Sequence, residues 1–395
     1  METYEILRDL AIIIIAAKFF GLIARKCKAP QVVGEILAGV IIGPAVLGWV
    51  SQTQMVTYLA EIGVILLMFS AGLATNLREL LKTGPQALLV ACCGVFIPLI
   101  GGSLLYMCFY GFMPWGSDEF FRAVFIGVIL TATSVSITAE TLKEMGKIST
   151  KIGTLIMSAA IIDDVIGIIV LTFVIGFKDP EAKPGMVVLK TVLFFAFAIV
   201  VGFISYKLFK LFDKRYPHTR RIPIAGLAFC FAFSFIAERI FGVADITGAY
   251  VAGIILCSLS DSSYIERKID INSYMLFGPI FFSSIGMKTS FDGIDSSIIW
   301  FSIGFVLIGL LTKIVGCGLM TKTFKYSWND SLKVGIGMMT RGEVALIVSQ
   351  RGLAFGLLDS KYFTCVIMLI LFSSVLTPIF LKLLYSKDNN KLESQ

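Results

Sequence analysis

Two adjacent carboxylates, Asp163 and Asp164, lie in the middle of a long apolar stretch. The residues on either side, 159–162 and 165–170, carry no charge. An ionised carboxylate at the centre of a lipid bilayer costs at least about 2.5 kcal/mol, so two together need a compensating gain. In an apolar setting such a pair binds a cation or a proton, or it forms a structural salt bridge. We expect a site for a monovalent cation and for protons.

A lysine supplies the counter-charge for these carboxylates. Lys313 lies in the stretch 309–316, about as deep in its apolar surroundings as the aspartates are in theirs. From that depth a lysine side chain does not easily reach water. We expect Lys313 to pair with one aspartate, either as a fixed ion pair or as a pair that opens during function, because burial favours release of the lysine proton.

Two further apolar stretches, 120–142 and 332–356, are interrupted by polar residues and are predicted to be helices broken in the middle. Hydroxyl groups satisfy backbone groups that unwinding frees, and glycines permit the unwinding. Ordinary hydrogen bonding between intact helices is the alternative. The polar residues are Thr131, Thr133, Ser134, Ser136 and Thr138 in the first stretch, and Arg341 and Glu343 in the second, where they could balance the partial charges of opposed half-helix ends.

The chain that positions these residues is apolar almost throughout. Of its 395 residues 57% are hydrophobic and 15% charged, whereas about a quarter are charged in ordinary soluble domains. We predict an all-α polytopic membrane protein, with a single transmembrane domain over 1–395 and no soluble domain. About thirteen transmembrane helices are expected, at 6–24, 31–48, 55–74, 84–110, 120–142, 150–177, 186–211, 222–241, 245–259, 270–287, 297–321, 332–356 and 361–385.

Basic residues orient the predicted helices in the membrane. With thirteen spans, most lysines and arginines outside the spans fall on the side of the C-terminus. Basic segments remain in the cytoplasm, so we expect the N-terminus outside and the C-terminus inside the cell membrane. The net charge of +7 therefore reflects topology and does not indicate nucleic-acid binding.

The sequence also contains an internal repeat. Residues 34–42 match 248–256, and 72–75 match 286–289, both at an offset of 214 (248 minus 34). Seven spans, an odd number, separate the matching segments, so the two halves should have opposite orientations in the membrane. Inverted repeats are typical of secondary transporters, although small residues also match by chance in packed helices.

Four strings taken together resemble the monovalent cation:proton antiporter-2 family, and within it the sodium/proton antiporters of the NapA and GerN type. They are 131–134, 159–167, Lys313 and 341–344, and the segment 30–44 also resembles that family's second helix. The resemblance implies an inverted-repeat fold with two crossing broken helices. It implies core bundles at approximately 84–177 and 297–385, with the remaining helices forming a scaffold and dimerisation surface, and a homodimer in the lipid bilayer.

The resemblance also implies roles for individual residues. Asp164 would bind the proton and the cation alternately, and Asp163 would hold Lys313 until the cation enters. Thr133 and Ser134 would line the site, with Arg341 and Glu343 on the second broken helix. The expected activity is exchange of Na⁺, or of Li⁺ or K⁺, for H⁺ by alternating access, electrogenic and without a cofactor.

Other function classes remain as alternatives. The one histidine, His218, lies in a basic loop, so a histidine metal cluster and a Ser-His-Asp triad are both unavailable and we do not expect an enzyme. An intramembrane aspartyl protease needs its carboxylates on facing helices, and here they are adjacent on one. An ion-coupled symporter on a related inverted-repeat fold and a cation channel stay open.

Overall fold

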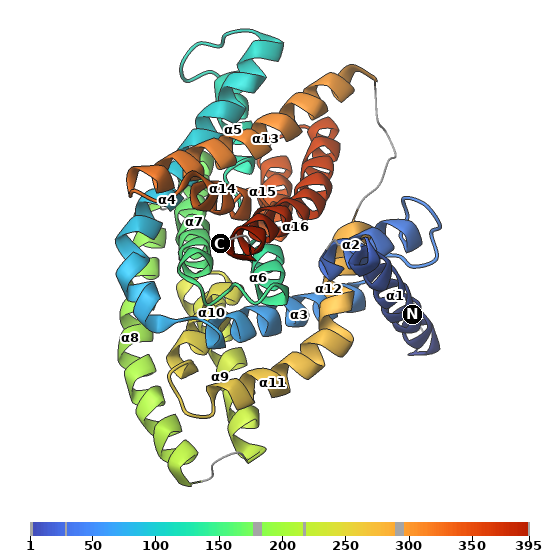
Figure 1. The fold of residues 1–395 in the computed structure, drawn as a ribbon. Coiled ribbons are helices and arrows are strands. Elements are labelled where there is room, and N and C mark those ends of the chain that lie inside the picture. The colour runs from blue at the N-terminus through green and yellow to red at the C-terminus, as the bar shows by residue number, and fades with distance from the viewer. Residues whose placement is uncertain (1–2, 28–29, 177–183, 216–218, 289–295, 394–395) are drawn as a thin grey trace.

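The described part of the chain is built of helices (Figure 1). The structure is a computed structural model, and it describes residues 3–27, 30–176, 184–215, 219–288 and 296–393. Within these ranges the backbone forms helices joined by turns and short loops, without a β-strand. The predicted all-α class is confirmed.

The helices from the two predicted core segments lie mostly in the upper half of Figure 1, with α6 near its middle. They are α4 (Leu77–Tyr110), α5 (Asp118–Ile129), α6 (Val135–Glu144), α7 (Lys151–Gly176), α13 (Ser296–Thr323), α14 (Trp328–Gly337), α15 (Glu343–Ala354) and α16 (Phe363–Glu393). Helix α4 packs against α5, α7 and α13, so both predicted core segments contribute to one packed group.

The remaining helices lie mostly in the lower half and at the right of that view, with α8 along the left edge. They are α1 (Thr3–Lys26), α2 (Gln31–Ile42), α3 (Gln54–Leu73), α8 (Pro184–Arg215), α9 (Arg221–Ile236), α10 (Asp245–Leu256), α11 (Ser262–Asn272) and α12 (Gly278–Met287). One π-helical turn, Ala237–Phe241, extends α9, and a second, Ser273–Phe277, joins α11 to α12.

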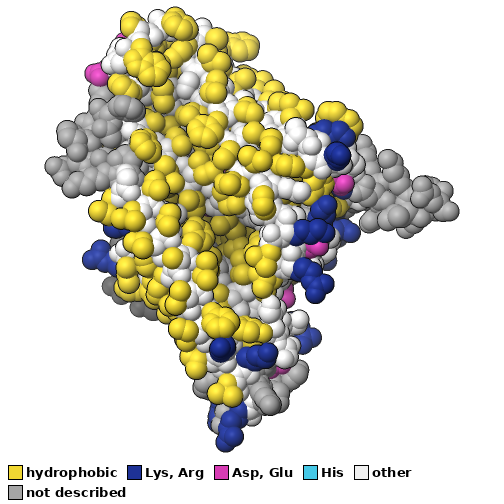
Figure 2. All heavy atoms as spheres, turned by 90° about the vertical axis from the view of Figure 1, so that its left-hand side faces the viewer, with side chains coloured by type: hydrophobic (Ala, Val, Ile, Leu, Met, Phe, Trp, Pro, Cys, Tyr) yellow, Lys and Arg dark blue, Asp and Glu magenta, His cyan; other side chains and the backbone are white. Residues whose placement is uncertain are grey.

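Several helices have the length and composition of membrane spans. Seven described helices qualify, and three shorter apolar helices accompany them. All thirteen predicted apolar runs overlap described helices. Figure 2 shows a broad apolar face with lysines and arginines mostly along its margins, as a bilayer requires. The chain is a multi-pass membrane protein.

Helix α11 is the element that the sequence did not predict. Its sequence, SSYIERKIDIN, is too polar for a span. It buries only Ile265 and Ile269 along one face, with polar residues on the other. It is therefore a short amphipathic helix that leads into α12, and hydropathy alone does not identify such an element.

Side-chain caps fix where the long core helices begin. The side chain of Asn76 accepts the backbone N–H groups of Arg78 and Glu79 at the start of α4. The hydroxyls of Ser117 and Ser327 cap α5 and α14 in the same way. Each cap satisfies N–H groups that have no partner within the helix.

The repeat is visible in how equivalent glycines are packed. Gly39 on α2 faces the backbone of Ser283 on α12, and any side chain at Gly39 would collide with the Ser283 carbonyl. Gly253 on α10 faces the carbonyl of Phe69 on α3 in the same way. The two glycines are related by the offset of 214 residues (253 minus 39), and so are the two residues that they face (283 minus 69). Helix α10 therefore packs on α3 as α2 packs on α12.

The reciprocal contacts have the same relationship. Gly72 on α3 faces the carbonyl of Tyr250 on α10, and Gly286 on α12 faces the carbonyl of Ile36 on α2. The offset is again 214 (286 minus 72 and 250 minus 36). Exchanging the two halves maps these contacts onto one another, which is the behaviour of a two-fold pseudo-symmetric repeat. The predicted internal repeat is thus present in the packing.

Candidate cation-binding site

Both predicted breaks are present, and they cross in direct contact. Residues 130–134 separate α5 from α6, and residues 338–342 separate α14 from α15. The backbone N–H of Ser134 donates to the carbonyl of Thr340 over 2.8 Å. The Thr138 hydroxyl donates to the carbonyl of Gly337 over 2.8 Å. Backbone groups freed by the unwinding therefore find partners inside the protein.

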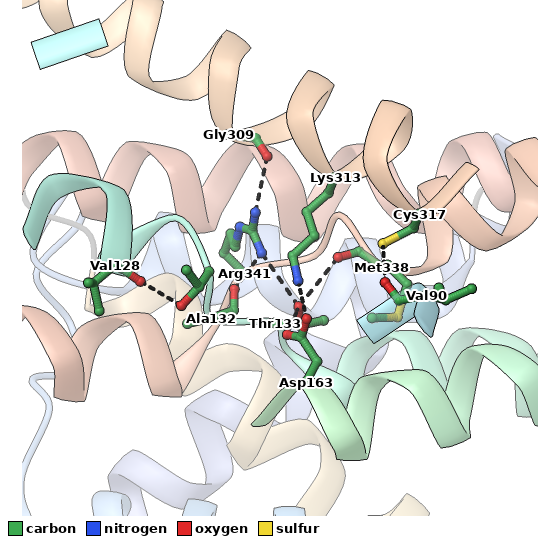
Figure 3. Close-up of polar contacts among 11 residues, drawn as sticks. Val90, Val128, Ala132, Thr133, Asp163, Gly309, Lys313, Cys317, Met338 and Arg341 are labelled. Carbon is green, nitrogen blue, oxygen red and sulfur yellow. Dashed lines mark hydrogen bonds and ion pairs between the residues drawn. The ribbon is translucent and has the colours of Figure 1, made fainter. Parts of the chain in front are cut away.

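Asp163 on α7 lies beside this crossing and is held by groups from two other segments (Figure 3). The Nζ of Lys313, on α13, lies 2.6 Å from Oδ1 of Asp163. The Thr133 hydroxyl, in the first break, donates to Oδ2 over 2.7 Å. The Asp163 side chain is 1% exposed and that of Lys313 is not exposed at all. The structure therefore pairs Lys313 with Asp163 in a site closed to solvent.

Arg341 adds a second buried cation from the second break. Its Nη1 donates to the carbonyl of Ala132 over 2.5 Å, and its Nη2 donates to the carbonyl of Gly309 over 3.1 Å. Ala132 follows the carboxyl end of half-helix α5, where the guanidinium offsets the partial negative charge of the helix. Figure 3 shows Arg341 and Lys313 side by side above Asp163.

The backbone of Arg341 is held as firmly as its side chain. Its N–H donates to the Ser373 hydroxyl over 2.9 Å, and its carbonyl accepts from the Ser374 hydroxyl over 3.2 Å. Both serines lie on α16 and are fully buried. Helix α16 therefore fixes the second break in place, and with it the position of the guanidinium.

The other predicted site residues lie close to this group in the sequence and the fold. Asp164 follows Asp163 on α7 and is 5% exposed. Because successive helical residues point about 100° apart, the two carboxylates leave α7 in different directions. Ser134 packs against Gly342 of the second break. Glu343 is the first residue of α15, and its side chain lies outside the described residues.

Sequence reasoning missed the backbone oxygens of the site. The carbonyls of Ala132, Gly309 and Met338 point at Arg341 or Thr133, and no residue type in the sequence marks a carbonyl for such a role. It also missed Cys317, one turn after Lys313 on α13, whose thiol lies 3.7 Å from the carbonyl of Val90 on α4. This contact brings α4 and α13 together beside the ion pair.

A second polar cluster lines a cavity of about 290 Å³ at the far end of α6. Lys143, near the end of α6, lies 2.5 Å from Oδ1 of Asp270 on α11 and 2.7 Å from the Ser70 hydroxyl on α3. The carboxylate of Glu144 accepts the backbone N–H of Gln31, the first residue of α2, at 2.9 and 3.1 Å. Half-helix α6 is thereby tied to α2, α3 and α11.

Nearly the whole sequence matches a known family. Residues 12–387 match the family described as "Sodium/hydrogen exchanger, transmembrane". The chain belongs to this family of sodium/hydrogen exchangers. The resemblance drawn from the motifs is confirmed.

Similar proteins include antiporters of several bacteria. This exchanger is 36% identical to the "Na(+)/H(+)-K(+) antiporter GerN" of Bacillus cereus over 392 residues, or 99% of each chain. It is 38% identical to the "Probable Na(+)/H(+) antiporter GerT" of the same organism, over 95% of this chain and 98% of that protein. An Enterococcus hirae Na⁺/H⁺ antiporter is 33% identical over 96% of this chain and 97% of that protein.

A solved structure has the same fold. The sodium proton antiporter MjNhaP1 of Methanocaldococcus jannaschii superposes with a TM-score of 0.76, covering 100% of this exchanger and 99% of that chain. The two sequences are 17% identical, so the match bears on the fold alone. It agrees with the inverted-repeat fold that the family resemblance implies.

Proposed function

We propose that this protein exchanges Na⁺ for H⁺ across the cell membrane as a secondary active antiporter. The observation that carries the proposal is the buried Lys313–Asp163 ion pair beside Asp164, where two broken helices cross. Membership of the exchanger family and the names of the relatives support it. The protein acts as a transporter and not as an enzyme, and it uses no cofactor.

Charge balance in the buried site couples the two ions. In the proton-loaded form Asp164 is protonated and the Lys313 ammonium lies on the Asp163 carboxylate. An entering Na⁺ binds the two carboxylates, so Asp164 loses its proton and Lys313 leaves Asp163 and loses its own. Competition for the same carboxylates therefore links the fluxes without nucleotide hydrolysis.

The net charge of the site in its two loaded forms makes the exchange electrogenic. With Arg341 always charged, the four side chains carry +1 in the proton-loaded form, since Asp163 contributes −1 and Lys313 and Arg341 contribute +1 each. In the cation-loaded form the two carboxylates contribute −2, and Na⁺ and Arg341 contribute +2, which gives zero. Two protons thus exchange for one Na⁺, and one net charge crosses the membrane per cycle.

Alternating access requires the core segments, approximately 84–177 and 297–385, to move against the remaining helices. Two cavities lie along that boundary. The cavity beside Lys143 and Asp270 is at one end. A cavity of about 710 Å³ is at the other end, lined by Glu61 and Asp245 from the remaining helices and by Leu346 and its neighbours from the core.

The remaining helices stay fixed in the membrane and form the homodimer. The N-terminus faces outward and the C-terminus lies in the cytoplasm.

Cation-driven proton flux in proteoliposomes tests this function. Purified protein is reconstituted with an internal pH dye, and Na⁺, Li⁺ or K⁺ is added outside. We expect a pH change with Na⁺ that Asp164→Asn abolishes and that Glu119→Gln, a change at an exposed residue of α5, leaves intact. K⁺ is included because one relative is named for it.

The other function classes give different results in the same assay. A channel would pass the cation with no proton coupling and without saturation. A symporter would show no cation-evoked pH change unless an organic substrate were added. Flux that is unchanged in Asp164→Asn would remove Asp164 from the mechanism.

A further inference from the structure

Gly94 on α4 lies directly against the Asp163–Lys313 ion pair. A Cβ atom added at Gly94 would lie 3.0 Å from Oδ1 of Asp163 and 3.3 Å from Nζ of Lys313. These are the two atoms that form the 2.6 Å ion pair. One flank of the pair is therefore covered by bare backbone, and the room for the pair exists because residue 94 has no side chain.

The close approach of α4 and α13 explains why this flank is so tight. A side chain at Gly316 on α13 would lie within 3.0 Å of the carbonyl of Cys93 on α4. One turn away, the thiol of Cys317 points at the carbonyl of Val90. Small residues on both helices thus let the backbones approach closely at the depth of the ion pair.

Gly94 differs in this respect from other glycines of the same helix. At Gly84, also on α4, an added Cβ would meet nothing within 4 Å. At Gly101 and Gly102 it would meet side chains and backbone of α13 and α5, away from any charged atom. Among the described glycines, Gly94 is the position where a Cβ would contact charged atoms of the ion pair.

We infer that Gly94 is a positioning residue for ion exchange: by leaving space beside Asp163 and Lys313, it sets how firmly Lys313 occupies the carboxylate that the cation must take. The inference rests on the proposed function. An alanine methyl at 94 requires the carboxylate oxygen or the ammonium to move by a few tenths of an ångström. The ion pair becomes longer and weaker, and Lys313 competes less well against the cation.

Gly94→Ala should change the KM for Na⁺ and the pH profile in a definite direction. A weaker competitor means that Na⁺ saturates Gly94→Ala at a lower concentration, so the KM for Na⁺ falls by about three- to tenfold, as expected for groups in direct contact. The maximal rate does not rise, because a more tightly held cation leaves more slowly. The pH profile moves toward lower pH, because the weakened pair holds the Lys313 proton less firmly.

Cys317 offers a competing explanation that the experiment must separate. The same added Cβ would lie 2.9 Å from its sulfur, so Gly94→Ala could act by pushing the thiol instead of the ion pair. Removing the sulfur with Cys317→Ala relieves that collision and leaves the contact with Asp163 in place. The double variant Gly94→Ala/Cys317→Ala therefore reports on the ion pair alone.

The test measures the Na⁺ KM, the maximal rate and the pH profile of the full-length protein in proteoliposomes. The variants are Gly94→Ala, Cys317→Ala, their combination, and Gly84→Ala as the matched control on the same helix. Alanine favours a helix more than glycine does, so the control measures the effect of the substitution on α4 itself. If Gly94→Ala does not accumulate, the double variant, which lacks the sulfur collision, carries the test.

We expect a lower KM and an acid-shifted pH profile in Gly94→Ala relative to the parent and Gly84→Ala, and in the double variant relative to Cys317→Ala. A purely structural role would lower the maximal rate and leave KM and the pH profile unchanged, which would overturn the inference. A double variant with the KM of Cys317→Ala would also overturn it. If the parent itself shows no Na⁺-driven proton flux, the proposed function fails instead.

Discussion

The Nζ of Lys313 lies 2.6 Å from Oδ1 of Asp163, although the two residues are 150 positions apart in the chain. The pair joins α13 to α7 at a point that solvent does not reach. Separating two such buried charges has a high free-energy cost unless another ion takes the place of the ammonium. A cation that replaces the ammonium is therefore the natural way for this pair to open.

Removing Lys313 should destabilise the protein. Lys313→Met leaves the Asp163 carboxylate buried without its counter-charge, which typically costs about 3–5 kcal/mol. We expect a clear fall in the melting temperature of the purified protein. The double variant Asp163→Asn/Lys313→Met removes both charges and should recover most of the loss, as thermal unfolding in detergent will show. Equal melting temperatures for the parent and the single variant would mean that the pair contributes nothing to stability.

Replacing Arg341 by lysine should not be conservative. The guanidinium bridges the carbonyls of Ala132 and Gly309, and an ammonium lacks the planar fork needed to reach both. The Ala132 carbonyl lies in the first break, outside the helices, and a buried carbonyl left without a donor costs about 1–3 kcal/mol. Arg341→Lys should therefore lower the melting temperature and the Na⁺-driven flux. The matched control is Arg122→Lys, which changes a half-exposed pair with Asp359 and should alter neither.

The Thr133 hydroxyl should help to hold the Asp163 carboxylate. It donates to Oδ2 of Asp163 over 2.7 Å, at a carboxylate closed to solvent. Thr133→Val keeps the shape and removes the donor, and loss of a hydrogen bond to a charged group costs about 1.5–3 kcal/mol. We expect a lower melting temperature and a weaker Na⁺-driven flux, and Thr133→Ser should restore both. Thr131→Val should change neither, because the Thr131 hydroxyl donates to the Val128 carbonyl of its own segment.

The contacts at the end of α6 should slow the movement of the core segments. Lys143 holds Asp270 and Ser70, and both contacts must break if α6 moves away from α11 and α3. Lys143→Met should raise the maximal rate of Na⁺-driven flux with little change in KM. The control is Lys268→Met, an exposed lysine of α11 whose ammonium lies 5.5 Å from the Tyr264 ring. A slower Lys143→Met variant would show that these contacts assist the movement instead.

Some features could be predicted from the sequence. They depend on the free-energy cost of burying a charge, or of burying backbone groups that have lost their helical hydrogen bonds. Lys313 could be paired in advance with one of the two aspartates because these charges lie too deep to reach water alone. The choice of Asp163 came from the family resemblance. The break before Ser134 could be predicted because hydroxyl groups cluster there. The repeat was readable because glycines that contact a backbone, such as Gly39 and Gly253, tolerate no substitution in the packing.

The remaining features depend on relationships that residue types do not encode. Arg341 faces backbone carbonyls of Ala132 and Gly309, and every residue has a carbonyl. Lys143 and Asp270 pair across 127 residues, and at the ends of predicted spans both look like ordinary surface charges. Gly94 matters because it has no side chain. This is apparent only when α4, α7 and α13 are placed together.

Proton release on Na⁺ binding tests the account most directly. Purified protein in a weakly buffered solution is titrated with NaCl, with choline chloride as the control, and the change in pH is recorded together with bound Na⁺. Competition at Asp163 and Asp164 predicts that each Na⁺ bound releases protons, and that Asp164→Asn abolishes the release. Na⁺ binding without any proton release in the parent protein would contradict the account.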